Sequence, residues 1–301
     1  MVTPQINPLN KSLLSEKPLN PNWVTGFTDA EGSFISSVYK RKGAKGYTVR
    51  PLFEIGLHSK DVAILYKIKE FFGCGNVSIR QTRKAASFSV GDLDSLLNVI
   101  IPHFKKYSLL TQKKVDFDLW VKIVNLIYSK EHLTPEGLAK ILELKSVLNR
   151  GLPTKIKLDN TNVKLLERPL HLVSSFKCIK PMWLVGFTDG EGSFNLRFIK
   201  RATGRNQIDV RFRLTQHIRD LNLLTLITEY LGCGKIYMMS LAYSLEVFSY
   251  SVIITKIAPF FTKYPLETEK AKDFIYFSQG VEIVEIVQIV EIVEIVKIEI
   301  I

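Results

Sequence analysis

The sequence predicts an α+β fold of two pseudo-symmetric half-domains, each with the element order αββαββα and a four-stranded antiparallel sheet. The first supporting observation is an internal repeat: residues 23–34 and 183–194 agree at nine of twelve positions, at an offset of 160. The second is that Gly-Cys-Gly recurs at 73–75 and 232–234. The third is that helix-like and strand-like segments follow both copies in the same order. We therefore expect two related halves on one chain.

Each repeated motif is typical of a short helix that leads directly into a strand. Pro21 and Pro181 suit the first position of a helix, where the missing amide hydrogen costs nothing. Asn20 is a suitable cap for the first helix. Gly32 and Gly192 follow the last turn, and the pattern predicts that both are left-handed C-terminal caps.

The remaining elements are assigned from hydrophobic periodicity and turn residues. In the first half we expect two strands within 33–58, a helix at 59–73, two strands within 76–90, and helices at 92–107, 112–128 and 134–149. Pro102 should break or kink its helix. The second half repeats the order up to the helix that contains Pro259.

The repeat divides the chain into four segments. They are an N-terminal half-domain at 1–149, a connector at 150–180, a C-terminal half-domain at 181–280 and a low-complexity tail at 281–301. The tail repeats Val-Glu-Ile with a three-residue period. Two apolar residues in every three fit neither an amphipathic helix nor a half-buried strand well, and we assign the tail no function.

Composition indicates a basic globular protein. The net charge is +12, and because the tail holds five Glu and one Lys (−4), residues 1–280 carry about +16. That excess favours a polyanionic partner. The three cysteines include no close pair, which argues against a disulfide framework or a zinc site. The chain shows neither a signal peptide nor an uninterrupted apolar run of membrane-spanning length, so we expect no membrane association.

Acidic residues at the ends of both motif helices point to a metal. Asp29, Glu31, Asp189 and Glu191 fall at helix C-termini, where the helix dipole disfavours carboxylates. If the two helices pack together, these acids converge and require a cation between them or raised pKa values. Oxygen ligands without His or Cys favour a hard ion such as Mg²⁺.

The doubled Gly-Phe-Thr-Asp-x-Glu-Gly sequence resembles the two signature helices of a single-chain LAGLIDADG homing endonuclease. The resemblance implies that the motif helices form a seam and that the two sheets make a saddle for DNA. It implies Mg²⁺, with Ca²⁺ or Mn²⁺ as substitutes, held by Glu31, Glu191 and the carbonyls of Ala30 and Gly190.

The resemblance also suggests roles for residues near that metal. Lys113 and Lys270 resemble basic residues of the family's active site, and Asp29 and Asp189 are more consistent with a structural role than a catalytic one. Glu54 and Arg213 roughly match a water-positioning strand residue, although their chemistry differs.

Basic and polar residues of the strands and hairpins are the candidates for DNA contact, because strand ribbons fit the major groove. We expect the helices to cover one face of each sheet and leave the other face open. The candidates are Ser36, Lys40, Arg41, Lys42, Arg50, Arg80, Gln81 and Arg83 in the first half, and Asn195, Arg197, Lys200, Arg201, Arg205, Gln207, Arg211, Arg213 and Lys235 in the second.

These residues favour a site-specific endonuclease that cuts both strands of a long, pseudo-palindromic DNA target. Two alternatives stay open: an RNA maturase that assists intron splicing, and a catalytically inactive DNA-binding protein on the same scaffold. We expect a monomer without an obligate protein partner, because both halves lie on one chain. The resemblance further implies an intron-encoded protein that is made in, and acts in, a mitochondrion or another organelle.

Overall fold

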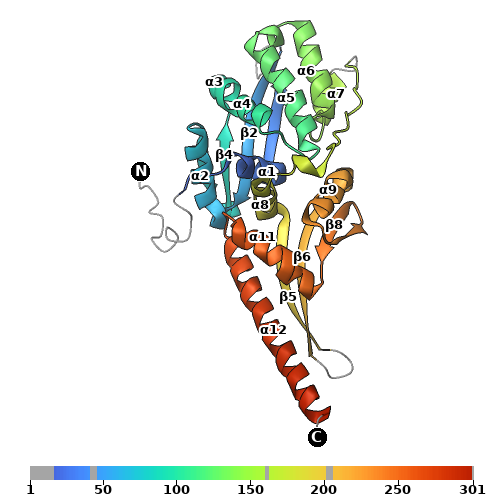
Figure 1. Ribbon diagram of the computed structural model, residues 1–301. Helices are drawn as coiled ribbons and strands as arrows, with labels where there is room; N and C mark the ends of the chain where they lie inside the picture. The colour runs from blue at the N-terminus through green and yellow to red at the C-terminus, as the bar shows by residue number, and fades with distance from the viewer. Residues whose placement is uncertain (1–16, 41–45, 160–162, 201–205, 300–301) are drawn as a thin grey trace. The chain divides into compact units, whose positions relative to one another are not determined.

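The structure is a computed structural model that describes residues 17–40, 46–159, 163–200 and 206–299. The described residues form two compact units, which meet in the sequence between Val173 and Ser174. We call them the N-terminal half and the C-terminal half, and Figure 1 labels their elements. The dividing point lies inside the segment 150–180 that the sequence indicates as a connector.

The N-terminal half follows the predicted element order and then adds helices. Its elements are α1 (Pro21–Glu31), β1 (Gly32–Lys40), β2 (Tyr47–His58), η2 (Ser59–Asp61), α2 (Val62–Phe72), β3 (Asn76–Arg80), η3 (Gln81–Arg83), β4 (Ala85–Val90), α3 (Leu93–Ser95), η4 (Leu96–Ile100), α4 (Ile101–Lys106), α5 (Lys113–Tyr128), η5 (Glu131–Leu133), α6 (Pro135–Val147) and α7 (Thr154–Asp159). The helix that contains Pro102 is not broken: helical backbone is continuous from Leu93 to Lys106, and the π-helical turn η4 directly before α4 accommodates the proline.

The C-terminal half repeats that order with one long final helix. Its elements are η6 (Phe176–Cys178), α8 (Pro181–Glu191), β5 (Gly192–Lys200), β6 (Asn206–His217), η7 (Ile218–Asp220), α9 (Leu221–Leu231), β7 (Lys235–Met239), β8 (Ala242–Val247), α10 (Tyr250–Val252), η8 (Ile253–Ile257), α11 (Ala258–Lys263) and α12 (Lys270–Glu299). Helix α12 follows α11 in the chain as α5 follows α4 in the N-terminal half.

Each half contains one four-stranded antiparallel sheet. The strand orders are β1-β2-β4-β3 and β5-β6-β8-β7, so the two sheets have the same topology. The registers also correspond: Phe34 lies opposite Phe53 in the first sheet, and Phe194 lies opposite Phe212 in the second. The predicted fold class is therefore confirmed.

An aromatic cluster fills the space between each sheet and its helices. Phe34 packs on Phe53, and its ring also contacts Phe104 of α4 and Phe117 and Trp120 of α5 at centroid distances of 5.1–5.4 Å. In the C-terminal half, the rings around Phe194 are Phe212, Phe261, Phe274 and Phe277. Because these helices cover one face of each sheet, the other face is left to the polar residues.

The glycines that end the motif helices have a different role from the predicted one. Gly32 and Gly192 have φ −79° with ψ 159° and 156°, which is extended and not left-handed backbone. The strand begins at the glycine itself, so no reversal of the chain is needed. A Cβ on Gly32 would lie 2.8 Å from the Thr28 carbonyl oxygen. Glycine is thus required by close packing against the last helical turn.

The tail at 281–301 was predicted to suit a helix poorly, yet helix α12 continues to Glu299. Tail residues Val281 and Val284 are buried, which ties the start of this segment to the core of the C-terminal half. Gly280 lets α12 approach β5, because a Cβ there would overlap the Leu196 side chain. Helix α12 therefore starts at Lys270, before the Val-Glu-Ile repeat of the tail, and its helical backbone continues into that repeat.

Within the described ranges, no helix has both the length and the apolar character needed to cross a bilayer.

Candidate active site and nucleic-acid interface

The C-terminal end of α1 is fixed by a buried carboxylate. Asp29 accepts hydrogen bonds from the Leu110 amide at 2.8 Å, from the Thr111 amide at 3.1 Å and from the Thr111 hydroxyl at 2.6 Å. Its exposed fraction is 3%. Three donors satisfy a charge that the helix end would otherwise disfavour, so the predicted structural role for Asp29 is supported by its geometry.

The same arrangement recurs at the end of α8. Asp189 accepts from the Glu267 amide at 3.0 Å, from the Thr268 amide at 3.2 Å and from the Thr268 hydroxyl at 2.6 Å. Thr111 and Thr268 are therefore equivalent residues that the sequence analysis missed. Their constant offset of 157, shared by Lys113 and Lys270, is the sequence signal that could have found them.

The ammonium groups of the two predicted lysines donate hydrogen bonds to backbone carbonyl groups at these two helix ends. The Lys113 ammonium donates to the Thr28 carbonyl at 2.9 Å and to the Ala30 carbonyl at 3.1 Å. A cation at a helix C-terminus is favourable because it offsets the negative end of the dipole. The Thr111 hydroxyl also accepts from the Lys113 amide at 3.1 Å, so the Asp–Thr pair starts the helix that carries the lysine.

Lys270 makes the matching contacts in the other half. Its ammonium donates to the Thr188 carbonyl at 3.0 Å and to the Gly190 carbonyl at 2.9 Å, and its amide donates to the Thr268 hydroxyl. We call each set of linked Asp, Thr and Lys residues a motif-end circuit. The two circuits are the same to within about 0.2 Å in every shared distance.

The atoms at each motif end are suited to a hard metal ion. Glu31 and Glu191 are the last residues of α1 and α8 and are partly exposed. Next to them are the Ala30 and Gly190 carbonyls, each of which has a second lone pair beside the one that accepts from lysine. Carboxylate and carbonyl oxygens are what Mg²⁺ and Ca²⁺ prefer. No cluster of three or more His, Cys, Asp or Glu side chains with metal-binding geometry occurs in the described part of the chain.

The open face of the N-terminal sheet is rich in small polar side chains. Cross-strand pairing aligns Ser33, Glu54, Ser89 and Asn76 in one row, and Gly56, Ser87 and Ser78 in the next. Two predicted DNA contacts, Arg50 and Arg80, lie on this face and are exposed. Gln81 and Arg83 are exposed on the turn η3 at the hairpin tip.

Ser36 was assigned to the wrong face of the sheet. Its exposed fraction is 1%, and it shares the core face of β1 with Phe34 and Val38. Its hydroxyl finds no hydrogen-bond partner within the described residues. Ser37, opposite Arg50, is the exposed neighbour that lies on the open face.

Lys40 also differs from its predicted role. It lies at the end of β1 and forms an ion pair with Asp159 of α7 at 3.5 Å, and the Tyr47 hydroxyl reaches the same carboxylate at 3.4 Å. This contact directs Lys40 toward α7 and not toward the open face. Two further candidates of this hairpin, Arg41 and Lys42, lie outside the described residues.

The open face of the C-terminal sheet is more highly charged. Ser193, Arg213, Glu246 and Lys235 form the row that corresponds to Ser33, Glu54, Ser89 and Asn76. Register therefore places Glu54 and Arg213 at equivalent positions beside the motif ends. The predicted residues Asn195 and Arg197 are exposed on the same face.

Arg211 is held in place by its neighbours on this face. It forms ion pairs with Asp209 at 3.3 Å and Glu246 at 3.4 Å, and its guanidinium lies 4.4 Å from the centroid of the Phe248 ring. Its side chain is about a quarter exposed, so it remains accessible while these contacts restrict its rotation. A guanidinium fixed in this way is preorganised for a bidentate contact.

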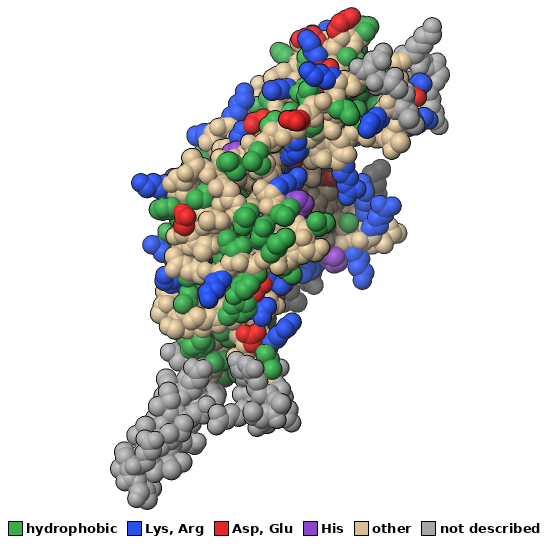
Figure 2. All heavy atoms as spheres, turned by 90° about the vertical axis from the view of Figure 1, so that its right-hand side faces the viewer, with side chains coloured by type: hydrophobic (Ala, Val, Ile, Leu, Met, Phe, Trp, Pro, Cys, Tyr) green, Lys and Arg blue, Asp and Glu red, His purple; other side chains and the backbone are tan. Residues whose placement is uncertain are grey.

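Four DNA-contact candidates of this half fall within residues 200–207. Lys200 and Gln207 lie on β5 and β6 by backbone register, with Gln207 paired to Ile199. Arg201 and Arg205 fall outside the described residues. Figure 2 shows Lys and Arg side chains spread over the described surface of the face in view, with fewer Asp and Glu among them.

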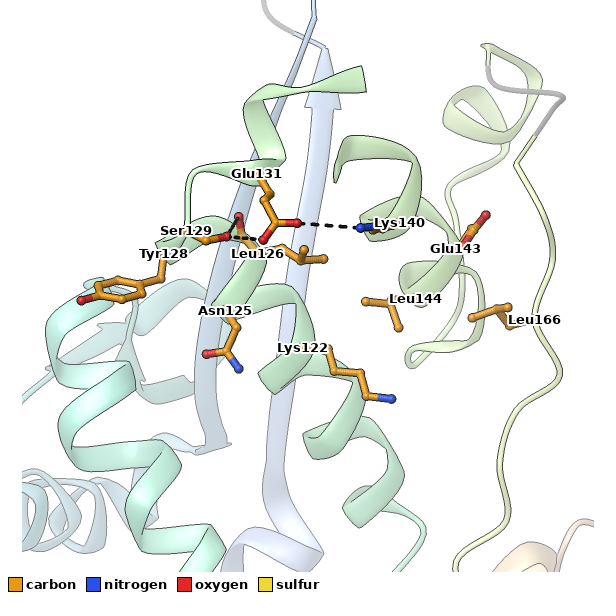
Figure 3. Close-up of a pocket in the computed structure, with 10 residues that line it drawn as sticks. All are labelled: Lys122, Asn125, Leu126, Tyr128, Ser129, Glu131, Lys140, Glu143, Leu144 and Leu166. Carbon is orange, nitrogen blue, oxygen red and sulfur yellow. Dashed lines mark hydrogen bonds and ion pairs between the residues drawn. The ribbon is translucent and has the colours of Figure 1, made fainter. Parts of the chain in front are cut away.

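A separate groove of about 630 Å³ lies on the N-terminal half, between the end of α5, η5 and α6 (Figure 3). Leu126 and Leu144 form part of its wall. Two acids line it, Glu143 and Glu131, and Glu131 accepts from the Ser129 hydroxyl at 2.8 Å and pairs with Lys140 at 3.8 Å. Each motif end instead gathers a carboxylate and a carbonyl beside a lysine, so we take the motif ends as the candidate site.

Comparison with known proteins agrees with this assignment. The family profile described as LAGLIDADG endonuclease matches residues 24–124 and 184–281. A relative from Neurospora crassa, named probable intron-encoded endonuclease 2, is 35% identical over 88% of this chain and 60% of its own length. Another from Mycosarcoma maydis, named probable intron-encoded DNA endonuclease 1, is 31% identical over 84% of this chain and 95% of its own. The chain thus spans 60% of the length of the first relative.

A solved structure is also similar. It is described as I-SmaMI bound to uncleaved DNA target in the presence of calcium ions. Its TM-score is 0.84 at 34% identity, over 89% of this chain and 92% of that chain.

Proposed function

Because the chain belongs to the LAGLIDADG endonuclease family, we propose that it is a site-specific, metal-dependent DNA endonuclease that cuts both strands of a long, pseudo-palindromic target. The observation that carries this proposal is the duplication of the motif-end circuit. Each half ends its motif helix with a carboxylate, a carbonyl and a lysine in the same geometry. Two equivalent sets suit two equivalent cuts, one in each strand.

The residues of each motif end have distinct tasks in this proposal. Glu31 and Glu191 hold the metal, and the Ala30 and Gly190 carbonyls support it. When bound, a divalent ion activates water and stabilises the charge that develops on the phosphate. Lys113 and Lys270 add positive charge beside the scissile phosphate. Asp29 and Asp189 fix the segments that aim the lysines.

Recognition is assigned to the open faces of the two sheets. The exposed residues Arg50, Arg80, Arg197 and Lys235 provide positive charge, and Ser, Asn and Arg side chains can pair with base edges. The two faces differ in sequence at equivalent positions, so the two half-sites of the target should differ as well. Mg²⁺ is the proposed metal, and the calcium ions described in the I-SmaMI structure support a divalent ion of this kind.

The relatives named intron-encoded support an intron as the location of the gene. A mitochondrion or another organelle is the place of action that we propose. The alternative role in RNA splicing has no specific observation in its favour. An intron-splicing assay would detect that activity directly.

The central test is target selection followed by cleavage. A library of randomised duplex DNA is selected for binding in Ca²⁺, and a plasmid that carries the recovered site is then incubated with Mg²⁺ or with a chelator. We expect linear product with Mg²⁺ and none with chelator. Specific binding without cleavage in Mg²⁺ or Mn²⁺ would instead identify a DNA-binding protein without nuclease activity.

A further inference from the structure

The segment that follows α7 is attached to the first turn of α5, the helix that begins at Lys113. Arg168 makes a two-pronged ion pair with Asp116: one terminal nitrogen donates to Oδ1 at 2.8 Å and the other to Oδ2 at 2.9 Å. The same guanidinium donates to the Val147 carbonyl at 2.7 Å and to the Gln112 carbonyl at 3.1 Å. One arginine thus joins the start of α5 to the end of α6.

A second pair of bonds strengthens this attachment. The Gln112 side chain donates to the His171 carbonyl at 2.5 Å and accepts from the His171 amide at 3.2 Å. Asp116, which is 4% exposed, also accepts from the Asn149 amide at 2.9 Å. These contacts fix Gln112, directly before Lys113, and Asp116, three residues after it. We call the set Gln112, Asp116, Asn149, Arg168 and His171 the connector latch.

The latch belongs to one half of the molecule. The repeat offset of 157 pairs Asp116 with Asp273 in the first turn of α12, and Asp273 is exposed. The starts of α5 and α12 share the motif-end circuit, with Asp29 and Asp189 in the same role. The start of α5 is therefore held from two sides, by the circuit and by the latch.

We propose that Arg168 is a positioning residue for the cleavage reaction, and that through the first turn of α5 it sets where the Lys113 ammonium lies against the Ala30 carbonyl. This inference rests on the proposed nuclease function. Lys113 is the first residue of α5, and its ammonium reaches the Thr28 and Ala30 carbonyls from there, so a displaced first turn changes the distance that the side chain must span. Catalytic geometry is sensitive at this scale, because a displacement of about 1 Å can cost about 100-fold in rate.

The asymmetry of the latch has a consequence that a purely structural contact would not have. Lys113 and Lys270 belong to different motif ends, so a looser α5 should slow the reaction at one end and spare the other. The enzyme would then cut one strand at its normal rate and the second strand slowly. Nicked DNA would accumulate before linear DNA appears.

The test uses the full chain and a supercoiled plasmid that carries the selected site, with the two strands of a matching duplex labelled separately. The main variant is Arg168→Lys, which keeps a positive charge beside Asp116 but cannot form the two-pronged pair. The second is the double variant Asp116→Asn with Arg168→Gln, which removes both charges of the ion pair together. We expect cleavage of one strand to fall about 10-fold in both variants, with the other strand within about twofold of wild type.

Asp273→Asn is the matched control, and both strands should be cut at wild-type rates. Binding of the same duplex in Ca²⁺, measured by gel shift, should stay within about threefold for all variants, because the open faces lie on the strands. Equal slowing of both strands, or unchanged rates in both latch variants, would overturn the positioning role while leaving the nuclease assignment intact. If the wild-type chain cuts neither strand, the proposed function and this inference both fail.

Discussion

The N-terminal and C-terminal halves agree closely at the ends of their motif helices and differ on their open sheet faces. The motif-end circuits match donor by donor, with Thr111 and Thr268 both 2.6 Å from their aspartates. Where the first sheet has Ser89 and Asn76, the second has Glu246 and Lys235. The comparison indicates that the parts assigned to chemistry are constrained to one geometry, whereas the parts assigned to recognition are free to diverge.

The strongest way to test the equivalence of the two motif ends is to remove one charge at a time. Glu31→Gln and Glu191→Gln each keep the shape of the side chain but remove the charge proposed to hold the metal. We expect double-strand cleavage to fall by about 1,000-fold or more in either variant, since charge stabilisation of this kind contributes several kcal/mol.

Cleavage of the selected plasmid and a gel shift on the same site would check this prediction together. Binding should be largely unchanged, because the open faces are intact. Wild-type cleavage by one of the two variants would show that the ends are not equivalent, and loss of folding would make that glutamate structural.

The equivalence of the circuits also predicts equal effects on stability. Asp29→Ala and Asp189→Ala each leave two amides and a threonine hydroxyl without their buried acceptor. We expect each substitution to lower the free energy of unfolding by about 4 kcal/mol. Denaturant unfolding of the two variants gives the comparison, with Asp273→Ala as an exposed control. A cost below about 1 kcal/mol for one of them would break the correspondence.

A third prediction concerns a residue that differs between the halves. His103 of α4 packs beside Phe71, Phe72 and Tyr107, and its Nε2 lies 3.2 Å from the Thr25 hydroxyl of α1. Burial lowers the pKa of His103 to about 4. The repeat offset places Phe260 at this position in the C-terminal half.

The sign of the pH effect follows from that pKa. Below about pH 6.5 the unfolded chain binds a proton at His103 that the folded chain does not bind until about pH 4. The free energy of unfolding should therefore fall as the pH drops through this window, by about 3 kcal/mol in total. His103→Phe, the residue of the other half, should remove this component. The measurement is the denaturation midpoint of the wild type and of His103→Phe from pH 4 to 7.5. If the two midpoints change with pH at the same slope, the assignment to His103 is wrong.

The smallest predicted effect is on target specificity. Arg211 is fixed by two carboxylates and an aromatic ring, whereas the Ser37–Arg50 pair of the first sheet has the single ring contact of Arg50 with Tyr39 at 5.3 Å. We expect Arg211→Ala to reduce discrimination at one or two bases of a single half-site by about 2 kcal/mol each. Repeating the selection with this variant would reveal it, and Ser37→Ala should change the preference less.

Local sequence patterns were sufficient to predict the helices and sheets that carry the candidate site. The repeat identified both motif helices, and the strand alternation and turn residues gave the correct sheets. Lys113 and Lys270 were predicted from the family resemblance, and both keep the repeat spacing of 157. Proline at the first position of each motif helix and the glycine directly after its last residue are signals that depend on near neighbours alone.

Features that depend on distant contacts could not be predicted in this way. Ser36 and Ser37 are adjacent and chemically identical, and their faces are decided by the burial of Phe34 against α4 and α5. Arg168 and Asp116 form an ion pair although they are 52 residues apart in the sequence, and no local sequence pattern around either residue predicts the pair. The prediction that the tail suits a helix poorly was wrong because it rested on the composition of the tail, whereas helix α12 begins at Lys270, before the tail.

The direct junction between α1 and β1 links accuracy to speed. Glu31 is the last residue of the helix and Gly32 the first of the strand, so no loop separates the carboxylate proposed to hold the metal from the sheet face proposed to read bases. A strand that shifts to accommodate a wrong base would carry the carboxylate with it. Mismatches close to this junction should then slow cutting more than they weaken association, and the enzyme would proofread its target through geometry after it has already bound.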